Sequence, residues 1–482
     1  MVGSGGGSSG SPTRPPLALV AGSTAGAPSP SPVPSAAPGK RRQFRSRPDL
    51  TPPEIELTTL AKGVAPGYIL YTPGNGAGVD GPTIVDDSGD LVWARGGSGR
   101  SVAGFQVVQY QGRPTLAWWE GTVNGGIGSG DFVLLDASYR EIGRIEAGGG
   151  GAADLHELRV TADGTALFFA DAGVAPAVSP AVPYQAMDCA IREVDLASGR
   201  LAWTWHSLDH IGLDESYVTP PTTTGQVFDY AHLNSIEVDR DGHLLVSARN
   251  TSTIYKVDRA TGEIVWRLGG KRNDFTMGDG AAFSWQHDAR RQADGTLTLY
   301  DDSAKPGQSR GLVLEIDETA RSARRVRDFV HPTGLLSTSQ GNMQVLPNGD
   351  VFVGWGSEPF FSEFAPDGTL LFDATFPAGV QSYRDLRSPW VGRPDDAPAL
   401  AVDSSRPTGL TVFASWNGAT EVAVWDVLGG ASAGSLRSLG SAVRSGFETT
   451  IDVAERPTVL TVRAVDGDGG VLGTSVPVIA PG

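Results

Sequence analysis

The chain has 482 residues, enough for several hundred residues of buried core and a second, smaller domain. Its 38 Lys and Arg residues stand against 54 Asp and Glu residues, a formal net charge of −16, so nucleic acid and anionic membranes are poor candidates as partners. No apolar run approaches the roughly 18 to 20 residues that a membrane-spanning helix needs. The 64 Gly, 33 Pro and 11 Trp residues, with turn signals at short intervals, favour an all-β protein of many strands.

Residues 1–52 differ from the rest of the chain, because they are rich in Gly, Ser, Pro and Ala and cannot build a core. We predict that they form a disordered leader. The stretch PPLALVAGSTAGA within them resembles a weak secretory signal, and a Ser/Pro-rich spacer ahead of a folded domain fits a secreted or cell-envelope protein. A mis-assigned start or an engineered leader is equally compatible with these residues.

A repeated hairpin pattern dominates the middle of the chain. Four segments consist of a strand, an Asp-Gly or Asn-Gly turn and a second strand: HELRVTADGTALFFADA, HLNSIEVDRDGHLLVSARN, QHDARRQADGTLTLYDDSA and GNMQVLPNGDVFVGWGS. Third strands with closing aromatic signatures, such as KVDRATGEIVWRLGG, follow several of them. About six such four-stranded units predict a six-bladed β-propeller, which we assign to residues 53–397.

The tail has a different pattern. TGLTVFASWNGATEVAVWDVL and FETTIDVAERPTVLTVRAVDGDGGVLGTS alternate like the strands of a sandwich. Residues 398–482 are therefore predicted to form a small immunoglobulin- or fibronectin-like β-sandwich with Trp416 and Trp425 in its core. We find no catalytic candidate there.

The propeller geometry places three histidines at one end of the channel. The first strand of each blade lines the channel, and these strands run in the same direction, so residues at equal phase form a ring. His156 and His287 each precede the Asp of their turn by seven residues, and His232 precedes its Asp by nine, which keeps it on the same face of a period-2 strand. Arg249 returns along the second strand to the end where His232 and Asn234 lie. We therefore predict that three imidazoles and one guanidinium meet at one mouth of the channel.

The histidines could also have purely structural roles. A single histidine at a strand start is more often structural than catalytic, but three in phase beside an Arg weaken that interpretation. Asp171 and Asp302 lie opposite His156 and His287 in their hairpins, and could either orient the imidazoles or be ordinary polar strand ends.

The residue types favour an anionic guest over a metal. Three imidazoles can hold zinc with one position open, but Arg249 would oppose a divalent cation and no Asp or Glu shares the phase of the histidines, so no metal site is predicted. Imidazoles with a guanidinium suit an oxyanion, sulfate or phosphate. One neutral imidazole could attack sulfur or phosphorus while the others move a proton and stabilise charge. No Gly-rich phosphate loop precedes a helix, so neither a nucleotide donor nor another cofactor is predicted.

The segments DYAHLNSIEVDRDGHLLVSARN, FSWQHDAR, GNMQVLPNGDVFVGWG and SYRDLRSPWVGRP resemble the arylsulfotransferase family of six-bladed propellers, in the branch with a C-terminal β-sandwich. The resemblance runs from about residue 55 to the end. It implies transfer of a sulfuryl group from an aryl sulfate to a phenol through a sulfated histidine, without phosphoadenosine phosphosulfate. It also implies small-molecule partners, an aryl sulfate and a phenolic acceptor.

The resemblance also implies roles for individual residues. By motif match, His287 of Gln-His-Asp would be the nucleophile, and His232 of His-x-Asn-Ser would act on the proton of the donor and acceptor oxygens. Arg249 of Ser-x-Arg would bind the sulfuryl oxygens, and His156 would be a further catalytic histidine. Asn234 is expected to bind substrate or to support the residues that do.

Two other functions stay open at this point. A non-catalytic propeller could bind a sulfated or anionic ligand, or a protein partner, at the same mouth. A quinone-dependent dehydrogenase would account for Trp-ended strands such as TGEIVWRLGG, but it predicts metal-binding carboxylates in the channel, which the sequence does not provide. Some members of the resembling family carry a disulfide, which a chain with the single cysteine Cys189 cannot form internally.

Overall fold

A computed structural model describes residues 40–60, 63–74, 81–148, 151–174, 184–223, 225–305 and 308–481. Within these ranges the regular structure is almost entirely β, and the helical segments are the single turns α1 (Ser207–His210) and η1 (Leu213–Glu215). None of the described helices has the length and apolar character to cross a bilayer. Most of the predicted leader, residues 1–39, lies outside the described residues.

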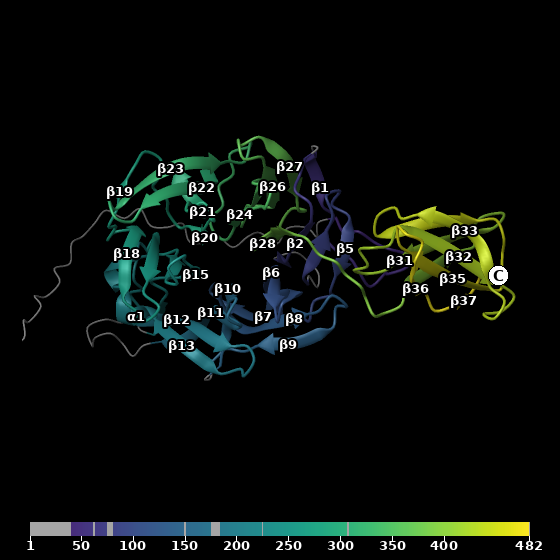
Figure 1. Ribbon diagram of the computed structural model, residues 1–482, viewed down its shortest axis with the longest axis horizontal. Helices are drawn as coiled ribbons and strands as arrows, with labels where there is room; N and C mark the ends of the chain where they lie inside the picture. Colours follow the sequence, from purple (N-terminus) through teal and green to yellow (C-terminus); the bar gives the residue numbers. More distant parts are fainter. Residues whose placement is uncertain are drawn as a thin grey trace, which may run out of the picture.

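Six antiparallel four-stranded units are arranged in a ring (Figure 1). The first unit contains β29 (Leu386–Ser388), β2 (Tyr68–Tyr71), β4 (Thr83–Val85) and β5 (Leu91–Ala94). The second contains β6 (Ser101–Tyr110), β7 (Arg113–Asn124), β8 (Ile127–Leu135) and β9 (Glu141–Ile145). The third contains β10 (Ala153–Val160), β11 (Thr165–Val174), β12 (Gln185–Asp195) and β13 (Leu201–His206), and the pairing of Ala153 with Gly130 joins it to the second in one continuous sheet.

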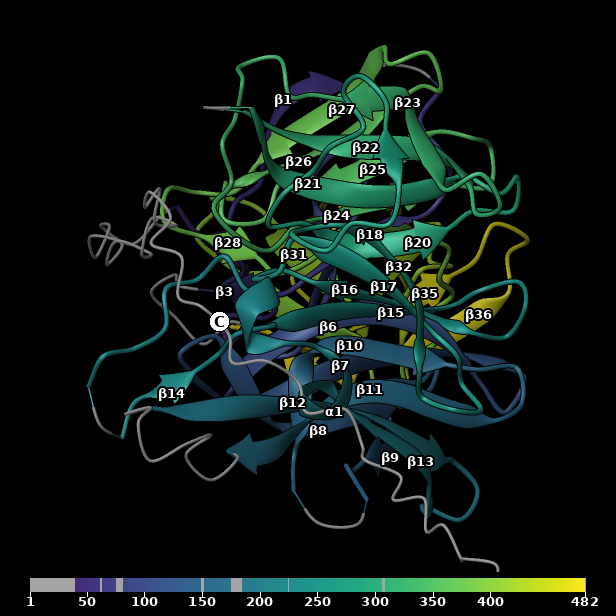
Figure 2. The same ribbon diagram turned by 90° about the vertical axis from the view of Figure 1, so that its left-hand side faces the viewer.

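The remaining units continue around the ring. The fourth contains β15 (Leu233–Val238), β16 (Leu244–Ala248), β17 (Thr253–Val257) and β18 (Ile264–Gly269). The fifth contains β20 (His287–Arg291), β21 (Leu297–Lys305), β22 (Gln308–Asp317) and β23 (Ser322–Phe329). The sixth contains β24 (Asn342–Val345), β25 (Val351–Gly354), β26 (Phe360–Phe364) and β27 (Leu370–Thr375), with β1 (Glu56–Leu60) outside it. Figure 2 shows the fourth unit between the third and the fifth.

Short strands complete the ring. The two-residue strands are β3 (Pro73–Gly74), which pairs with β28 (Gln381–Ser382), and β14 (Val227–Phe228) and β19 (Thr276–Met277), which pair parallel to β12 and β23. The prediction of an all-β propeller is confirmed by this arrangement.

The hairpins form where the Asp-Gly and Asn-Gly turns predict them. Gly164, Gly242, Gly295 and Gly349 have φ angles of 80°, 83°, 98° and 91°, a backbone region that favours glycine. Each of these glycines joins the first two strands of one unit, and residues at or beside the starts of β10, β15, β20 and β24 line a single cavity. The first residues of these strands therefore meet at one end of the ring.

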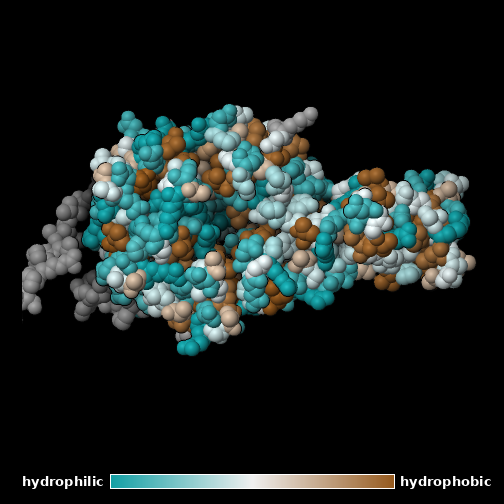
Figure 3. Space-filling model, in the orientation of Figure 1, coloured by the Kyte–Doolittle hydropathy of each residue, from teal (hydrophilic) through white to brown (hydrophobic). Residues whose placement is uncertain are grey.

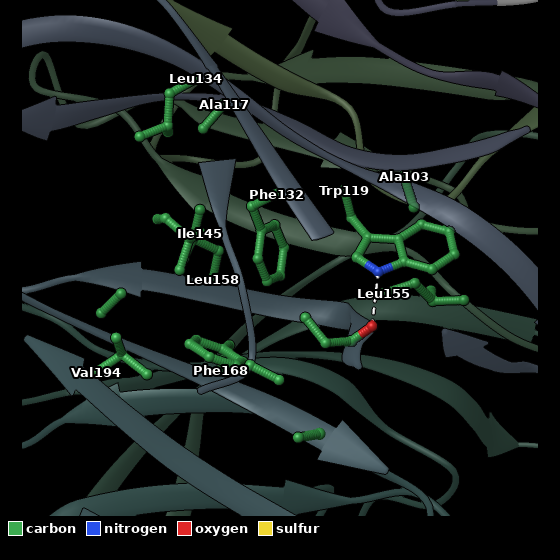
Figure 4. Close-up of a cluster of buried hydrophobic side chains, with 14 of the residues drawn as sticks. Ala103, Ala117, Trp119, Phe132, Leu134, Ile145, Leu155, Leu158, Phe168 and Val194 are labelled. Carbon is green, nitrogen blue, oxygen red and sulfur yellow. Dashed lines mark hydrogen bonds between the residues drawn. The ribbon is translucent and has the colours of Figure 1, made fainter. Parts of the chain in front are cut away.

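Apolar side chains fill the spaces between neighbouring units. One cluster joins Leu245 and Ile254 of the fourth unit to Leu297 and Leu299 of the fifth. Another lies between the second and third units, where the indole of Trp119 is fully buried (Figure 4). This packing of one sheet on the next holds the inner strands in their ring.

Segments from both ends of the propeller close the ring. β29 pairs with β2, and the fully buried Arg387 of β29 reaches the N-terminal segment. Its guanidinium lies 2.7 Å from Glu363 and 2.6 Å from Asp87, and it donates to the carbonyl oxygens of Ala65 and Gly67. Arg387 thus joins the first and sixth units by charge as well as by pairing.

The C-terminal strands form a separate two-sheet sandwich beside the first unit (Figure 1). One sheet contains β30 (Ala399–Asp403), β31 (Leu410–Ser415) and β34 (Glu448–Val453). The other contains β33 (Arg437–Val443), β32 (Val424–Gly430), β35 (Val459–Val465), β36 (Val471–Thr474) and β37 (Val478–Ile479). As predicted, Trp416 and Trp425 lie in its core.

The sandwich is docked on the ring through main-chain contacts. Asn417 exchanges two hydrogen bonds with the main chain of Ala94, and Gly418 N–H donates to the carbonyl of Val92. Both partners belong to β5 of the first unit.

The last part of the predicted leader, residues 40–52, contacts both the ring and the sandwich. Residues 40–52 are described, and Phe44 and Leu50 pack in a small core with Leu91, Ala94 and Phe447, which joins ring and sandwich. Composition averaged over a long leader conceals these two isolated apolar residues.

The buried position of Arg387 predicts a large cost for its removal. Arg387→Ala leaves Glu363 buried without its cationic neighbour, so we expect the free energy of unfolding to fall by roughly 3 to 5 kcal/mol. The matched control is Arg393→Ala, which removes a surface pair with Glu421 and should change stability little. Urea unfolding followed by tryptophan fluorescence measures both variants. Equal stability of the Arg387→Ala variant and the original protein would contradict the role given to Arg387 in closing the ring.

Candidate active site

A cavity of about 930 Å³ lies where the inner strands begin. His156, His232, His287 and Arg249, which the sequence places at one mouth of the channel, all line it. The space-filling view shows the ring hollowed at its centre (Figure 3). The structure therefore brings the four predicted side chains into one cavity.

A carboxylate contacts the Nδ1 atom of each imidazole. The three pairs and their distances are His156 with Asp154 at 2.5 Å, His232 with Asp229 at 2.5 Å, and His287 with Asp302 at 2.7 Å. A carboxylate beside Nδ1 holds the ring proton on that side, so a neutral imidazole presents its lone pair at Nε2. The three pairs thus fix both the orientation and the tautomer of the rings.

His287 is the most buried of the three imidazoles, with 2% of its side chain exposed. Burial, together with the neighbouring Arg249 and His232, holds the pKa of His287 well below its usual range. The backbone N–H of Gln340 donates to Nε2 at 3.3 Å, which is the arrangement expected for a lone pair at that atom. His287 therefore offers a neutral, nucleophilic Nε2 atom at neutral pH.

Asp302 differs from the other two carboxylates. Burial raises its pKa well above the usual range, despite the opposing effect of Arg249. Burial alone would also raise the pKa of Asp154 and of Asp229, but the adjacent imidazoles hold both below the usual value. Asp302 can consequently accept the Nδ1 proton of His287 more readily than its counterparts can accept theirs.

His156 and His232 lie together in the cavity. Their ring centroids are 4.8 Å apart in an edge-to-face arrangement. Tyr383 packs against His156 at 5.4 Å and against His287 at 6.5 Å between ring centroids, so its ring contacts both imidazoles. This tyrosine lines the cavity and was not identified from the sequence.

The guanidinium of Arg249 is held by neutral groups, and no carboxylate among the described residues forms an ion pair with it. The guanidinium donates to Asn250 Oδ1 at 3.0 Å and to the carbonyl of Thr338 at 2.8 Å, and it stacks on Trp285 at 4.9 Å. Its Nε atom has no hydrogen-bond partner in the described part of the chain. A rigid guanidinium whose charge is not neutralised by an ion pair is well suited to bind an anion.

Several residues around the cavity have a left-handed backbone. The φ angles of His232, Trp285, Asp288 and Gln340 are 52°, 58°, 55° and 70°. Such conformations cost about 1 to 3 kcal/mol each for residues other than glycine, and they tend to occur at functional sites. Two of these residues flank His287, so the strained backbone sets the direction in which this imidazole points.

A buried ionic network supports the cavity from below. Arg384 donates to Glu157 and to the carbonyl of Asn234, and Arg290 pairs with both Glu157 and Asp288. Asp288 Oδ2 in turn accepts a hydrogen bond from a backbone N–H at the start of β24. The network joins four inner strands directly beneath the histidines. The segment SYRDLRSPW contributed to the family resemblance, but no pattern assigned Arg384 to the channel.

Asn234 does not occupy the position expected of a substrate-binding residue. It is fully buried, it does not line the cavity, and its Nδ2 atom donates to the carbonyl of Gln286 at 2.7 Å. Of the two roles expected for Asn234, this contact fits the supporting one, because it holds the residue before His287 in place.

Two carboxylates, Asp302 and Asp171, were candidates to orient the imidazoles. Asp302 contacts His287, as one of the two sequence interpretations expected. The side chain of Asp171 lies outside the described residues, and Asp154 occupies the place beside His156.

No group of three or more His, Cys, Asp or Glu side chains in the described ranges has a geometry that could hold a metal ion. The other four histidines, His206, His210, His243 and His331, do not line the cavity.

Comparison with known proteins identifies one family. The family model described as arylsulfotransferase (ASST) matches residues 106–377, more than half of the chain. No curated protein matches the chain. The matched region contains His156, His232, His287 and Arg249, which line the cavity.

Solved structures give only distant similarity. A protein of unknown function from Bacteroides caccae is 14% identical with a TM-score of 0.41, covering 67% of this chain and 100% of its own. A periplasmic gluconolactonase from Pseudomonas aeruginosa is 14% identical with a TM-score of 0.35, covering 86% and 96%. A streptogramin B lyase is 11% identical with a TM-score of 0.35, covering 72% and 94%. These scores are too low to bear on the function of the chain.

The environment of His287 predicts its protonation state. Because its pKa is lowered, the ring should stay neutral at about pH 6, below the ordinary histidine value of about 6.5. Nitrogen NMR of the histidine-labelled protein, with His287→Gln to assign the signal, should show a protonated Nδ1 and an unprotonated Nε2. A histidine peptide titrated in the same buffer is the reference. An imidazolium signal for His287 at that pH would contradict the assignment.

Proposed function

The chain belongs to the arylsulfotransferase family, and we propose that it transfers a sulfuryl group from an aryl sulfate to a phenolic acceptor through a sulfated His287, without phosphoadenosine phosphosulfate. One observation carries this proposal. A neutral imidazole with its Nε2 atom at the cavity lies near a guanidinium that has no carboxylate partner among the described residues. A nucleophile beside an anion-binding group is the arrangement that sulfuryl transfer requires.

In the first half-reaction, Nε2 of His287 attacks the sulfur of the donor. The N–S bond forms while the bond from sulfur to the phenolic oxygen breaks, and the sulfuryl group is left on the imidazole. His232, as an imidazolium whose Nδ1 faces Asp229, gives its Nε2 proton to the departing oxygen. The products are a free phenol, a neutral His232 and the sulfated enzyme.

The second half-reaction reverses these roles with a new phenol. The acceptor hydroxyl gives its proton to Nε2 of His232, and its oxygen attacks the sulfur. The O–S bond forms, the N–S bond breaks, and His287 returns as a neutral imidazole. His232 returns as an imidazolium, so protons and charge balance over the whole cycle.

Asp302 and Arg249 stabilise the charges that develop in these steps. The His287 ring becomes positive when sulfur bonds to Nε2, and Asp302 can then take up the Nδ1 proton because burial raises its pKa. Arg249 and the backbone N–H of Gln340 are positioned to donate to the sulfuryl oxygens. His156, 4.8 Å from His232 between ring centroids, can bind the phenolic oxygen or a further sulfuryl oxygen.

Kinetics of three histidine variants test the proposal. With 4-nitrophenyl sulfate as donor and phenol as acceptor, the unaltered protein should release nitrophenolate with ping-pong kinetics, since two half-reactions share one site. His287→Ala should abolish transfer, and His232→Ala should reduce kcat by roughly 10²- to 10⁴-fold, the range for a lost proton-transfer group. His243→Ala, in the β15–β16 turn away from the cavity, is the matched control and should retain full activity.

Two results would count against this function. Undiminished transfer by His287→Ala would exclude His287 as the nucleophile. A protein that binds 4-nitrophenyl sulfate but never releases nitrophenolate would instead support a non-catalytic anion-binding propeller.

A further inference from the structure

One hairpin of the second unit, β7–β8, is longer than the corresponding hairpin of the fourth unit. β7 and β8 contain 12 and 9 residues and remain paired to the turn, where Asn124 lies opposite Ile127. The corresponding strands of the fourth unit, β16 and β17, contain 5 residues each. The extra length brings the tip of the hairpin, residues 123–126, to the cavity, where Val123, Gly125 and Gly126 line the wall.

The tip lies against one of the candidate catalytic groups. A Cβ atom built on Gly126 would lie 3.5 Å from Cε1 of His232, the carbon between the two ring nitrogens. A Cβ atom on Gly125 would meet nothing within 4 Å. Gly126 therefore leaves space beside the edge of His232 that any larger residue would occupy.

Asp154 connects this hairpin to the histidine cluster. Its Oδ2 atom accepts the backbone N–H of Gly128 at 2.7 Å, while its Oδ1 atom contacts His156. The indole of Trp119 in β7 also donates to the carbonyl of Ala153 at 2.8 Å, as the dashed line in Figure 4 shows. The hairpin is thus held on β10 at two points, and its tip is a fixed wall of the cavity.

The wall is apolar although it faces a polar cavity floor. Val123 is 44% exposed and lines the cavity, as does Leu155. Val227, which is 41% exposed, lies among the other lining residues. When an apolar ring covers exposed apolar side chains within a cavity, its binding is favoured by about 25 cal/mol for each Å² of apolar surface buried.

We propose that the tip of the β7–β8 hairpin, Val123 to Gly126, is the specificity-determining wall of this site, and that it admits fused-ring aryl groups. The proposal rests on the proposed function. The aryl plane packs on Val123 and uses the space that Gly126 leaves beside His232, which places the phenolic oxygen next to that imidazole. A cavity of about 930 Å³ has room for more than one aromatic ring.

Two glycine variants separate this role from backbone strain. Gly125 and Gly126 have φ angles of 58° and 89°, so alanine is strained at both, but only the Gly126→Ala methyl group points at His232. Donors with one ring, 4-nitrophenyl sulfate, and with two fused rings, 4-methylumbelliferyl sulfate, are compared by kcat/KM. Gly126→Ala should lower kcat/KM for the fused-ring donor at least five-fold relative to kcat/KM for the single-ring donor. Gly125→Ala should leave the ratio within two-fold.

A third variant alters the wall without changing a glycine. Val123→Ala removes apolar surface from the wall, so the KM for the fused-ring donor should rise about five-fold, with kcat within two-fold of the original. An unchanged ratio in Gly126→Ala, an equal change in both glycine variants, or an unchanged KM in Val123→Ala would each overturn the proposal.

Binding without turnover distinguishes failure of this inference from failure of the proposed function. Calorimetric titration with 4-methylumbelliferone, the free phenol, requires no sulfuryl transfer. If the protein transfers no sulfuryl group but Gly126→Ala weakens phenol binding and Gly125→Ala does not, the wall is supported and the function fails. If transfer is intact and binding is the same in all variants, the wall is rejected and the function stands.

Discussion

The contact between the Nδ1 atom of an imidazole and a buried carboxylate is the interaction on which this site depends. It occurs three times, at 2.5, 2.5 and 2.7 Å, and each time it leaves Nε2 as the atom available to the cavity. The three pairs are not equivalent, because the pKa of Asp302 is raised while the pKa values of Asp154 and Asp229 are lowered. One site can therefore hold a neutral nucleophile and still keep ionised carboxylates beside its proton-transfer groups.

The propeller supplies the rigidity that these contacts need. Buried carboxylates are costly unless they are compensated, and here Arg290 and Arg384 neutralise Glu157 and Asp288 directly beneath the histidines. The same scaffold carries the β7–β8 hairpin, which Asp154 links to His156. Chemistry and substrate selection thus share one carboxylate, so a change at Asp154 should affect both.

Features of the fold that depend on local residue patterns could be predicted from the sequence. Asp-Gly turns and period-2 alternation located the hairpins, and equal phase placed His156, His232 and His287 at one end of the channel. The carboxylate partners were harder to predict from the sequence. Asp229 contacts His232 across a turn in which His232 has a left-handed backbone, with a φ angle of 52°. Long-range contacts left no local pattern at all. Arg384 meets Glu157 across 227 positions of the chain, and the burial of Asn234 follows from the packing of β15 against β20.

The most direct test of the central claim is to locate the sulfuryl group on the protein. The protein is mixed with 4-nitrophenyl sulfate in the absence of an acceptor, quenched at neutral pH because a sulfated imidazole is acid-labile, and its peptides are analysed by mass spectrometry. The peptide that contains Trp285 and His287 should gain about 80 Da, and added phenol should remove this increment, as a covalent intermediate requires. An increment on His156 or His232, or none on any peptide while nitrophenolate is released, would contradict the account.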